Sequence, residues 1–191
     1  MDNGTKRDLR VVKTLDVIHE SFESLLLEKP FSKITVKALC DHARINKKTF
    51  YRYYPTLEDL RAELVSHYAE PYALRTKGLR YPQDLAVVTK TFLLYSAVQG
   101  VLYDAILCDC KHEELLDDII QGMEYERYAI STHPQGWEKE EWNLYMAHVT
   151  SAQLLIYRQW VKGGRSVPIE RMIEIGEALV CQGCQSIDIF N

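Results

Sequence analysis

Residues 47–54 read KKTFYRYY and combine positive charge, hydroxyl groups and aromatic rings within about two helical turns. At about 100° per residue, Lys48 and Arg52 project from one face of a helix while Phe50 and Tyr54 project from the other. Lysine and arginine bind phosphates and guanine edges, and hydroxyl groups donate hydrogen bonds to phosphates. The pattern predicts a helix that buries aromatic rings and presents donors to a polyanion. The simpler alternative is a solvated basic face between two core helices.

The charge around this segment differs from that of the whole chain. The chain has 23 basic and 27 acidic residues and a net charge of −4. Residues 29–54 contain seven basic residues and one acidic residue, so this segment carries +6 and the remainder −10. A local basic patch on an acidic protein favours polyanion binding by one region over a generally adhesive surface.

Capping residues indicate the helices that position this basic segment. Apolar residues at helical spacing predict a first helix over residues 8–28, which Pro30 ends. Thr35 is suited to be the N-cap of a short second helix, and Asn46 of a third. Thr56 and Asp59 resemble a capping box at the start of a fourth helix. Two short helices joined by a turn of about three residues predict a helix-turn-helix over residues 35–54, whose second helix enters the DNA major groove.

The rest of the chain shows helical periodicity and no sustained alternation typical of strands. Helices are expected over residues 84–99, 100–107, 113–130, 138–162 and 168–184. The expected fold class is therefore all-α. An N-terminal three-helix DNA-binding domain is expected over residues 8–68, and a second helical domain over residues 69–191.

Composition excludes several classes of protein. Of the 191 residues, 47% are hydrophobic and 26% are charged, which is typical of globular proteins and excludes fibrous and disordered chains. No apolar stretch approaches the ~18 residues of a membrane span, and the N-terminus MDNGTKRDLRVVK lacks the apolar core of a signal peptide. Five cysteines form an odd set in a chain of this length, which favours reduced thiols. A cytoplasmic protein without membrane contact is expected.

The segment ITVKALCDHARINKKTFYRYYPTLEDL resembles the DNA-binding region of TetR-family transcriptional regulators. The resemblance covers about a third of the chain. Matching positions are Thr35, Ala43, Ile45, Thr49, Tyr51, Arg52, Pro55, Glu58 and Leu60. It implies that Thr35, Lys47, Lys48, Thr49, Tyr51 and Tyr53 face DNA, while Ile45, Phe50 and Tyr54 form the core beneath them. Arg44 and Arg52 are added to the expected DNA-facing set because of their charge.

Three positions depart from the family pattern. Arg44 stands where the turn usually holds glycine, and a non-glycine residue at positive φ costs about 1 kcal/mol. Leu57 replaces a lysine that commonly contacts the DNA backbone, so one phosphate contact is missing. Tyr54 replaces the usual phenylalanine, and its hydroxyl needs a partner if the ring is buried.

The resemblance also implies a role for the C-terminal half. In the family, this half binds a small-molecule effector and forms a homodimer, here through residues 138–162 and 168–184, on a palindromic operator, and most members are repressors. The segment IYRQWVKGGRSVPIERM resembles the subgroup that contains the dihydroxyacetone-kinase operon regulator, which leaves activation open. All three tryptophans and nine of the 12 tyrosines lie beyond residue 66, which suits an apolar pocket with polar groups. The candidates for this pocket are Tyr95, Tyr103, Tyr145 and His148, and the alternative for each is a core or interface role.

Two other functions compete with DNA binding. Cys108, Cys110 and His112 lie within five residues, and Cys181 and Cys184 repeat a two-thiol spacing, so a metal- or thiol-responsive sensor is an alternative. A single C-x-x-C within a helical pattern is weak support for a metal site, however, and buried cysteines are the simpler interpretation. A small helical enzyme is the third class, but the sequence has no phosphate loop, nucleophile elbow or HExxH motif. No catalytic residue, metal or cofactor is expected.

Overall fold

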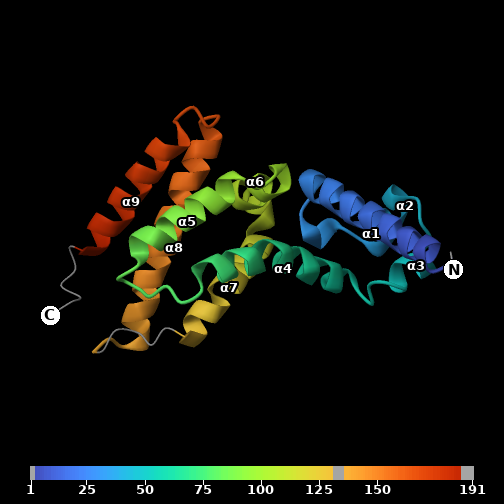
Figure 1. Cartoon of the computed structure of the whole chain (residues 1–191). Helices are drawn as coiled ribbons and strands as arrows, with labels where there is room; N and C mark the ends of the chain where they lie inside the picture. The colour runs from blue at the N-terminus through green and yellow to red at the C-terminus, as the bar shows by residue number, and fades with distance from the viewer. Residues whose placement is uncertain (1–2, 131–135, 186–191) are drawn as a thin grey trace.

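The computed structural model describes residues 3–130 and 136–185, and all regular structure in these ranges is helical. Figure 1 shows the arrangement of the elements. The helices are α1 (Asn3–Glu28), α2 (Val36–Ala43), α3 (Lys47–Tyr51), α4 (Leu57–Thr76), α5 (Leu85–Ala97), α6 (Val101–Cys108), α7 (Glu113–Ile130), α8 (Lys139–Lys162) and α9 (Ile169–Gln185), with 3₁₀ turns η1 (Phe31–Lys33) and η2 (Cys110–His112). The all-α class expected from the sequence is confirmed.

The short helices of the N-terminal region begin at the predicted caps. The Thr35 hydroxyl accepts a hydrogen bond from the Ala38 amide at 3.1 Å, and the Asn46 side chain accepts one from the Thr49 amide at 2.8 Å. Thr56 and Asp59 form a complete capping box at the start of α4. These side chains satisfy amide groups that have no partner within their own helices, so local sequence determines where each helix begins.

Two helix boundaries differ from the sequence expectation. Helix α1 begins at Asn3 rather than near residue 8. Helix α3 ends at Tyr51, so Tyr54 lies in the following turn instead of at the end of the helix. Its backbone still bonds to that of Phe50, since the Tyr54 amide lies 3.0 Å from the Phe50 carbonyl. Phe50 and Tyr54 therefore remain neighbours, with ring centroids 5.8 Å apart.

The N-terminal helices pack around a small apolar core. Ile18 and Leu26 of α1, Leu39 of α2 and Phe50 of α3 are all fully buried. Leu60 of α4 closes the same core with 1% exposure. Burying one large apolar side chain stabilises the fold by about 1.5–3 kcal/mol. Packing of these side chains therefore holds the short helices α2 and α3 in place.

Helix α4 joins the N-terminal region to the rest of the molecule (Figure 1). It continues past residue 68, the expected domain boundary, to Thr76. Helix α7 packs along it, and the two helices approach closely at Gly122. A Cβ added to Gly122 would lie only 2.8 Å from the Cβ of Ala69. The absence of a side chain at this position is what allows the close packing.

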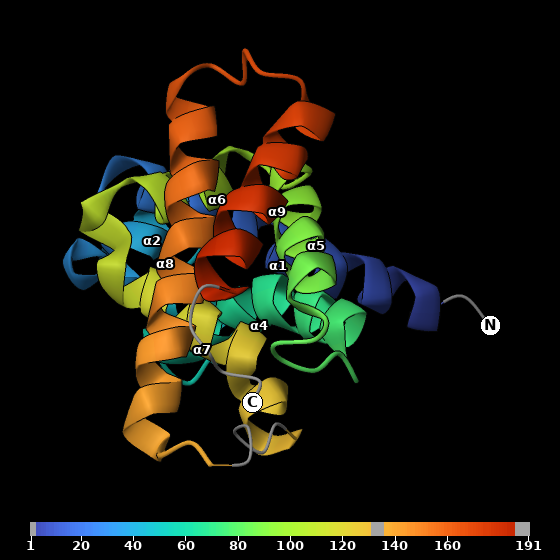
Figure 2. The same ribbon diagram turned by 90° about the vertical axis from the view of Figure 1, so that its left-hand side faces the viewer.

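The C-terminal half is built from α5 to α9. Figure 2 shows α8 and α9 side by side, with α5 against α9. A second apolar cluster joins Tyr81 and Leu85 to Trp142, Tyr145 and Val180. No helix among the described residues is both long and apolar enough to span a membrane.

Candidate nucleic-acid interface

The turn between α2 and α3 has the geometry that the sequence predicts for a helix-turn-helix. Arg44 ends α2 with φ 53° and ψ 39°, in the left-handed region. Its amide lies 3.4 Å from the Asp41 carbonyl, and the next amide, that of Ile45, lies 3.0 Å from the Cys40 carbonyl. Asn46 then begins α3, and its side-chain oxygen also accepts from the Thr49 hydroxyl at 3.0 Å. Backbone bonds and one cap thus fix the start of α3 relative to α2.

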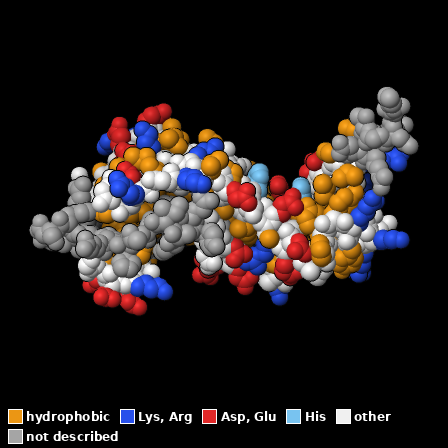
Figure 3. Space-filling view, turned by 60° about the horizontal axis from the view of Figure 1, so that its bottom comes forward, with side chains coloured by type: hydrophobic (Ala, Val, Ile, Leu, Met, Phe, Trp, Pro, Cys, Tyr) orange, Lys and Arg blue, Asp and Glu red, His pale blue; other side chains and the backbone are white. Residues whose placement is uncertain are grey.

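The predicted DNA-facing residues lie in and beside this turn. Exposed side chains are those of Thr35, Arg44, Lys47, Lys48, Tyr51 and Arg52, while Thr49 and Tyr53 are partly buried. Tyr51 is 52% exposed and packs edge-on against Phe50, with ring centroids 5.5 Å apart. The guanidinium of Arg52 lies 5.9 Å from the ring centroid of Tyr53. Figure 3 shows basic side chains around the end of the molecule that carries α1 to α3, and acidic side chains along its middle.

The structure shows the roles of Arg44 and Leu57, two of the positions that depart from the family pattern. Arg44 adopts the positive φ that glycine favours, so its backbone is strained by roughly 1–2 kcal/mol. Its side chain forms no hydrogen bond or ion pair within the part of the chain that the structure describes, and it points to solvent, where it can contact phosphate. Leu57 is 8% exposed and belongs to the core, so it contributes packing instead of a backbone contact.

The third departure, Tyr54, has the partner that its buried hydroxyl requires. The hydroxyl donates to Oε2 of Glu63 at 2.8 Å and lies 2.7 Å from Nε2 of His19. Burial raises the pKa of Tyr54, and the hydrogen bond to Glu63 raises it further. The phenol therefore stays protonated and remains a donor.

Comparison with known proteins shows what this region resembles. Residues 23–64 match the profile of the family described as "Bacterial regulatory proteins, tetR family". Residues 23–64 are thus similar to this family over about a fifth of the chain, and we refer to the helices that carry them, α1 to α4, as the TetR-family domain. The crystal structure of a TetR transcriptional regulator from Streptococcus agalactiae 2603V has a similar fold, with a TM-score of 0.54 and 20% sequence identity over 93% of this chain and 99% of that chain. Comparison with curated proteins gives no match.

Outside the TetR-family domain, the four residues expected in a ligand pocket lie in three different places. Tyr95 and Tyr103 are neighbours in the main core, with ring centroids 6.3 Å apart. The Tyr95 hydroxyl donates to the Tyr68 carbonyl at 2.7 Å, and that of Tyr103 lies 3.1 Å from the Ser96 hydroxyl. Tyr145 stacks on Trp142 in the second cluster, and His148 lies on the exposed face of α8. The structure brings two of the four together and separates the others.

The structure also shows a groove between α7 and α8 with a volume of about 520 Å³. Its apolar part includes Leu116, Met146 and Leu154, and its polar part includes Asp117 and Arg158. None of the four expected pocket residues lines it. The groove forms where two helices distant in sequence meet, so periodicity within either helix could not locate it.

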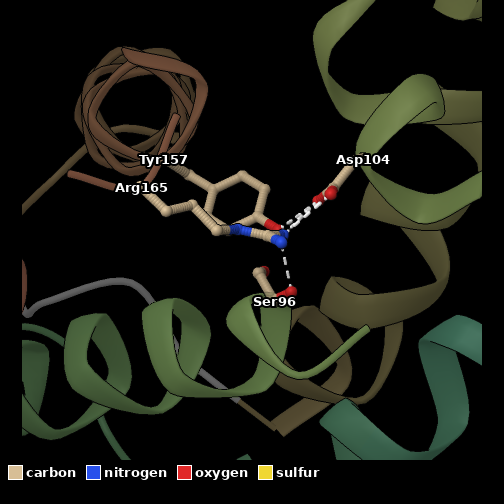
Figure 4. Close-up of polar contacts among 4 residues, drawn as sticks. All are labelled: Ser96, Asp104, Tyr157 and Arg165. Atoms are coloured by element: carbon tan, nitrogen blue, oxygen red, sulfur yellow. Dashed lines mark hydrogen bonds and ion pairs between the residues drawn. The ribbon is translucent and has the colours of Figure 1, made fainter. Parts of the chain in front are cut away.

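A polar network around Tyr157 was not expected from the sequence. Figure 4 shows Tyr157 of α8 between Ser96, Asp104 and Arg165. The Tyr157 hydroxyl lies 2.8 Å from the Ser96 carbonyl and 2.6 Å from Oδ1 of Asp104, and Arg165 pairs with Asp104 at 2.7 Å. Burial raises the pKa of Tyr157, so it too stays a donor. The network joins α5, α6, α8 and the α8–α9 turn, and its hydrogen bonds connect residues up to 61 positions apart.

The cysteines expected in a metal- or thiol-responsive site do not form a cluster with His112. Cys108 is partly buried and Cys110 is exposed, on either side of a bend in the chain, while His112 is 2% exposed. Burial raises the pKa of the Cys108 thiol, as does the nearby Asp104. Among the described residues, no three histidine, cysteine or acidic side chains are placed to hold one metal ion. The side chain of Cys184 lies outside the described residues.

Proposed function

We propose that this protein is a transcriptional regulator that binds a double-stranded DNA operator through the exposed face of α3. The observation that carries this proposal is the TetR-family domain at residues 23–64, whose recognition helix presents Lys47, Lys48, Tyr51 and Arg52 to solvent. Basic and hydroxyl groups on one helix provide both phosphate and base contacts. A regulator of this kind would act in the cytoplasm on chromosomal DNA.

We propose further that the protein binds DNA as a homodimer through α8 and α9. Large apolar side chains are exposed on both helices: Leu144 at 75%, Leu155 at 58%, Ile175 at 38% and Leu179 at 62%. Exposed apolar side chains on adjacent helices are typical of an interface between protein chains. A two-fold dimer would present two copies of α3 to half-sites about 34 Å apart, which fits a palindromic operator.

The ligand-responsive part of the proposal concerns the C-terminal half. An effector would change DNA binding only if it prefers one of two conformations of the dimer. The groove between α7 and α8 supports such a role because α7 also packs along α4, which leads into the TetR-family domain. Tyr95, Tyr103, Tyr145 and His148 remain candidates for contacts to an effector, and repression remains the expected mode of control. The resemblance of residues 156–172 to the dihydroxyacetone-kinase operon subgroup stays part of this proposal.

Selection of bound duplexes from a random DNA library tests the DNA-binding proposal. The intact protein should enrich one inverted repeat. The double variant Tyr51→Phe, Lys48→Ala should lose this enrichment while keeping the sedimentation coefficient of the wild type. Lys139→Ala is the matched control, because Lys139 is an exposed lysine at the start of α8. No enrichment by the wild type, or equal enrichment by the double variant, would contradict the proposal.

A further inference from the structure

Three helices of the TetR-family domain meet at the hydroxyl of Tyr54. The ring follows α3, Glu63 belongs to α4, and His19 belongs to α1. Nε2 of His19 lies 2.7 Å from the Tyr54 oxygen and 3.2 Å from Oε1 of Glu63, while the Tyr54 hydroxyl donates to Oε2 of Glu63 at 2.8 Å. We call these three residues the Tyr54 triad. Each member has a polar atom within 3.2 Å of both of the others.

The proton positions in the triad follow from the number of donors. A tyrosine hydroxyl has one proton, and here that proton goes to the Glu63 carboxylate. The Tyr54 oxygen is then left to accept, which matches the His19 tautomer that has a hydrogen on Nε2. Hydrogen bonds to an ionised carboxylate are stronger than those between neutral groups. The triad thus gives α3 a strong polar connection to α4 and α1.

Helix α3 depends on such outside support because it has only five residues. Helix formation is cooperative, and a helix shorter than ~12 residues is marginal in isolation. Phe50 provides one anchor by burying its ring completely. The Tyr54 triad provides a second anchor at the other end of α3, and two anchors define the direction of a short helix where one does not.

On the solvent side of the Tyr54 triad, close packing does not hold the side chains in place. A cavity of about 140 Å³ lies between α1 and α4, lined by His19, Glu23, Glu63 and His67 over an apolar base. The side chain of Glu63 is 53% exposed and that of His19 is 37% exposed. Histidine and acidic side chains are visible together at the narrow part of the molecule in Figure 3. Glu63 has room to move, so its hydrogen bonds determine its position.

The same turn of α4 is tied to the C-terminal half. Arg61, two residues before Glu63, pairs with Asp118 of α7, and its Nη2 donates to the Glu114 carbonyl at 3.1 Å. Its guanidinium also lies 4.9 Å from the ring centroid of Phe31. Helix α4 is therefore bonded to α7 through Arg61 and to the turn that follows α3 through Glu63.

We propose that Tyr54, Glu63 and His19 are positioning residues that set the direction of α3 relative to α4. The consequence for DNA rests on the proposed function. It is that DNA affinity depends on the Tyr54 hydroxyl, although this hydroxyl does not touch DNA. Tyr54→Phe removes the hydroxyl and keeps the ring, so it is the central variant. Glu63→Gln keeps an acceptor oxygen for Tyr54, whereas Glu63→Leu removes it.

Amide hydrogen exchange of the intact, DNA-free protein tests the positioning role without any DNA. Tyr54→Phe and Glu63→Leu should each speed exchange at the amides of residues 49–54 by about tenfold, and Glu63→Gln should restore most of the protection. Amides of α8 and α9 should keep their rates in every variant. Unchanged rates at residues 49–54 in Tyr54→Phe would overturn the proposal. Equal acceleration throughout the chain would also overturn it, because that result means a general loss of stability.

Titration of the selected inverted-repeat duplex tests the consequence for DNA. Tyr54→Phe should weaken binding about tenfold while leaving the slope of log K against log salt unchanged, because no phosphate contact is lost. Lys48→Ala should instead reduce that slope by about one. A wild type that fails to bind any duplex would refute the proposed function, while the exchange result would still decide the positioning role. Full affinity in Tyr54→Phe would refute the link between the triad and DNA binding.

Discussion

Replacing Arg44 with glycine should stabilise the protein, although it removes a charged residue from the proposed DNA-binding surface. Arg44 holds φ at 53°. The left-handed conformation costs an L-residue roughly 1–2 kcal/mol, and glycine avoids this strain. Glycine loses about 0.5–1 kcal/mol more conformational entropy on folding. The net gain is therefore about 0.5–1 kcal/mol, since the exposed side chain of Arg44 has no partner among the described residues that would be lost.

Thermal unfolding measures this gain. For a protein of this size, 1 kcal/mol corresponds to a shift in Tm of about 2–4 °C, so Arg44→Gly should melt about 1–4 °C higher than the wild type. Arg165→Gly is the matched control, because Arg165 also has a positive φ, of 55°. Its guanidinium pairs with Asp104 at 2.7 Å and lies 5.3 Å from the ring centroid of Trp160, so this variant should melt lower. An equal or lower Tm for Arg44→Gly would refute the account of strain at the turn.

Three further predictions concern the C-terminal half and its contact with the TetR-family domain. Tyr157→Phe should lower the free energy of unfolding by about 1–3 kcal/mol in urea titrations, because it removes the buried donor between Ser96 and Asp104. Unchanged stability would contradict the stabilising role of this polar network. Gly176→Ala should lower the free energy of unfolding by about 1–2 kcal/mol, because the new Cβ would lie 2.6 Å from Cδ1 of the fully buried Leu93. A Tm at or above that of the wild type would show that α5 and α9 are more loosely packed. Burial lowers the pKa of His112, and Lys111 lowers it further. The unfolded chain therefore binds a proton at higher pH than the folded one, so stability should fall as the pH drops below about 6.5, and His112→Gln should reduce this pH dependence; an equal pH dependence in the variant would assign it to other groups.

The beginnings of the short helices could be predicted because they depend on neighbouring residues. Thr35, Asn46 and Thr56 each accept the hydrogen bond that a cap requires, within three residues of their own position. The basic face of α3 follows equally from spacing along one helix. The end of α3 could not be predicted in this way, because Tyr54 bonds to Glu63 and His19, which are 9 and 35 residues away.

The C-terminal half was predictable as helices but not as a site. Aromatic content indicated a pocket, yet the hydroxyls of Tyr95 and Tyr103 bond to core partners from other turns and helices. Asp104 and Arg165 are separated by 61 residues, and neither position has a pattern that indicates the other. The groove between α7 and α8 also depends on how two distant helices meet. Such features follow from tertiary packing, and the periodicity of residues within one helix gives no information about that packing.

Binding of the intact protein to DNA from upstream of its own coding region tests the central proposal most directly. Fluorescence anisotropy should be measured at two salt concentrations, with a scrambled duplex of the same composition as control. The account predicts tighter binding to the upstream or selected inverted-repeat duplex than to the scrambled one, and a strong loss of affinity at higher salt, because Lys and Arg contacts release counterions from the phosphates. Equal, weak and salt-independent binding to every duplex would contradict a role for α3 in DNA recognition.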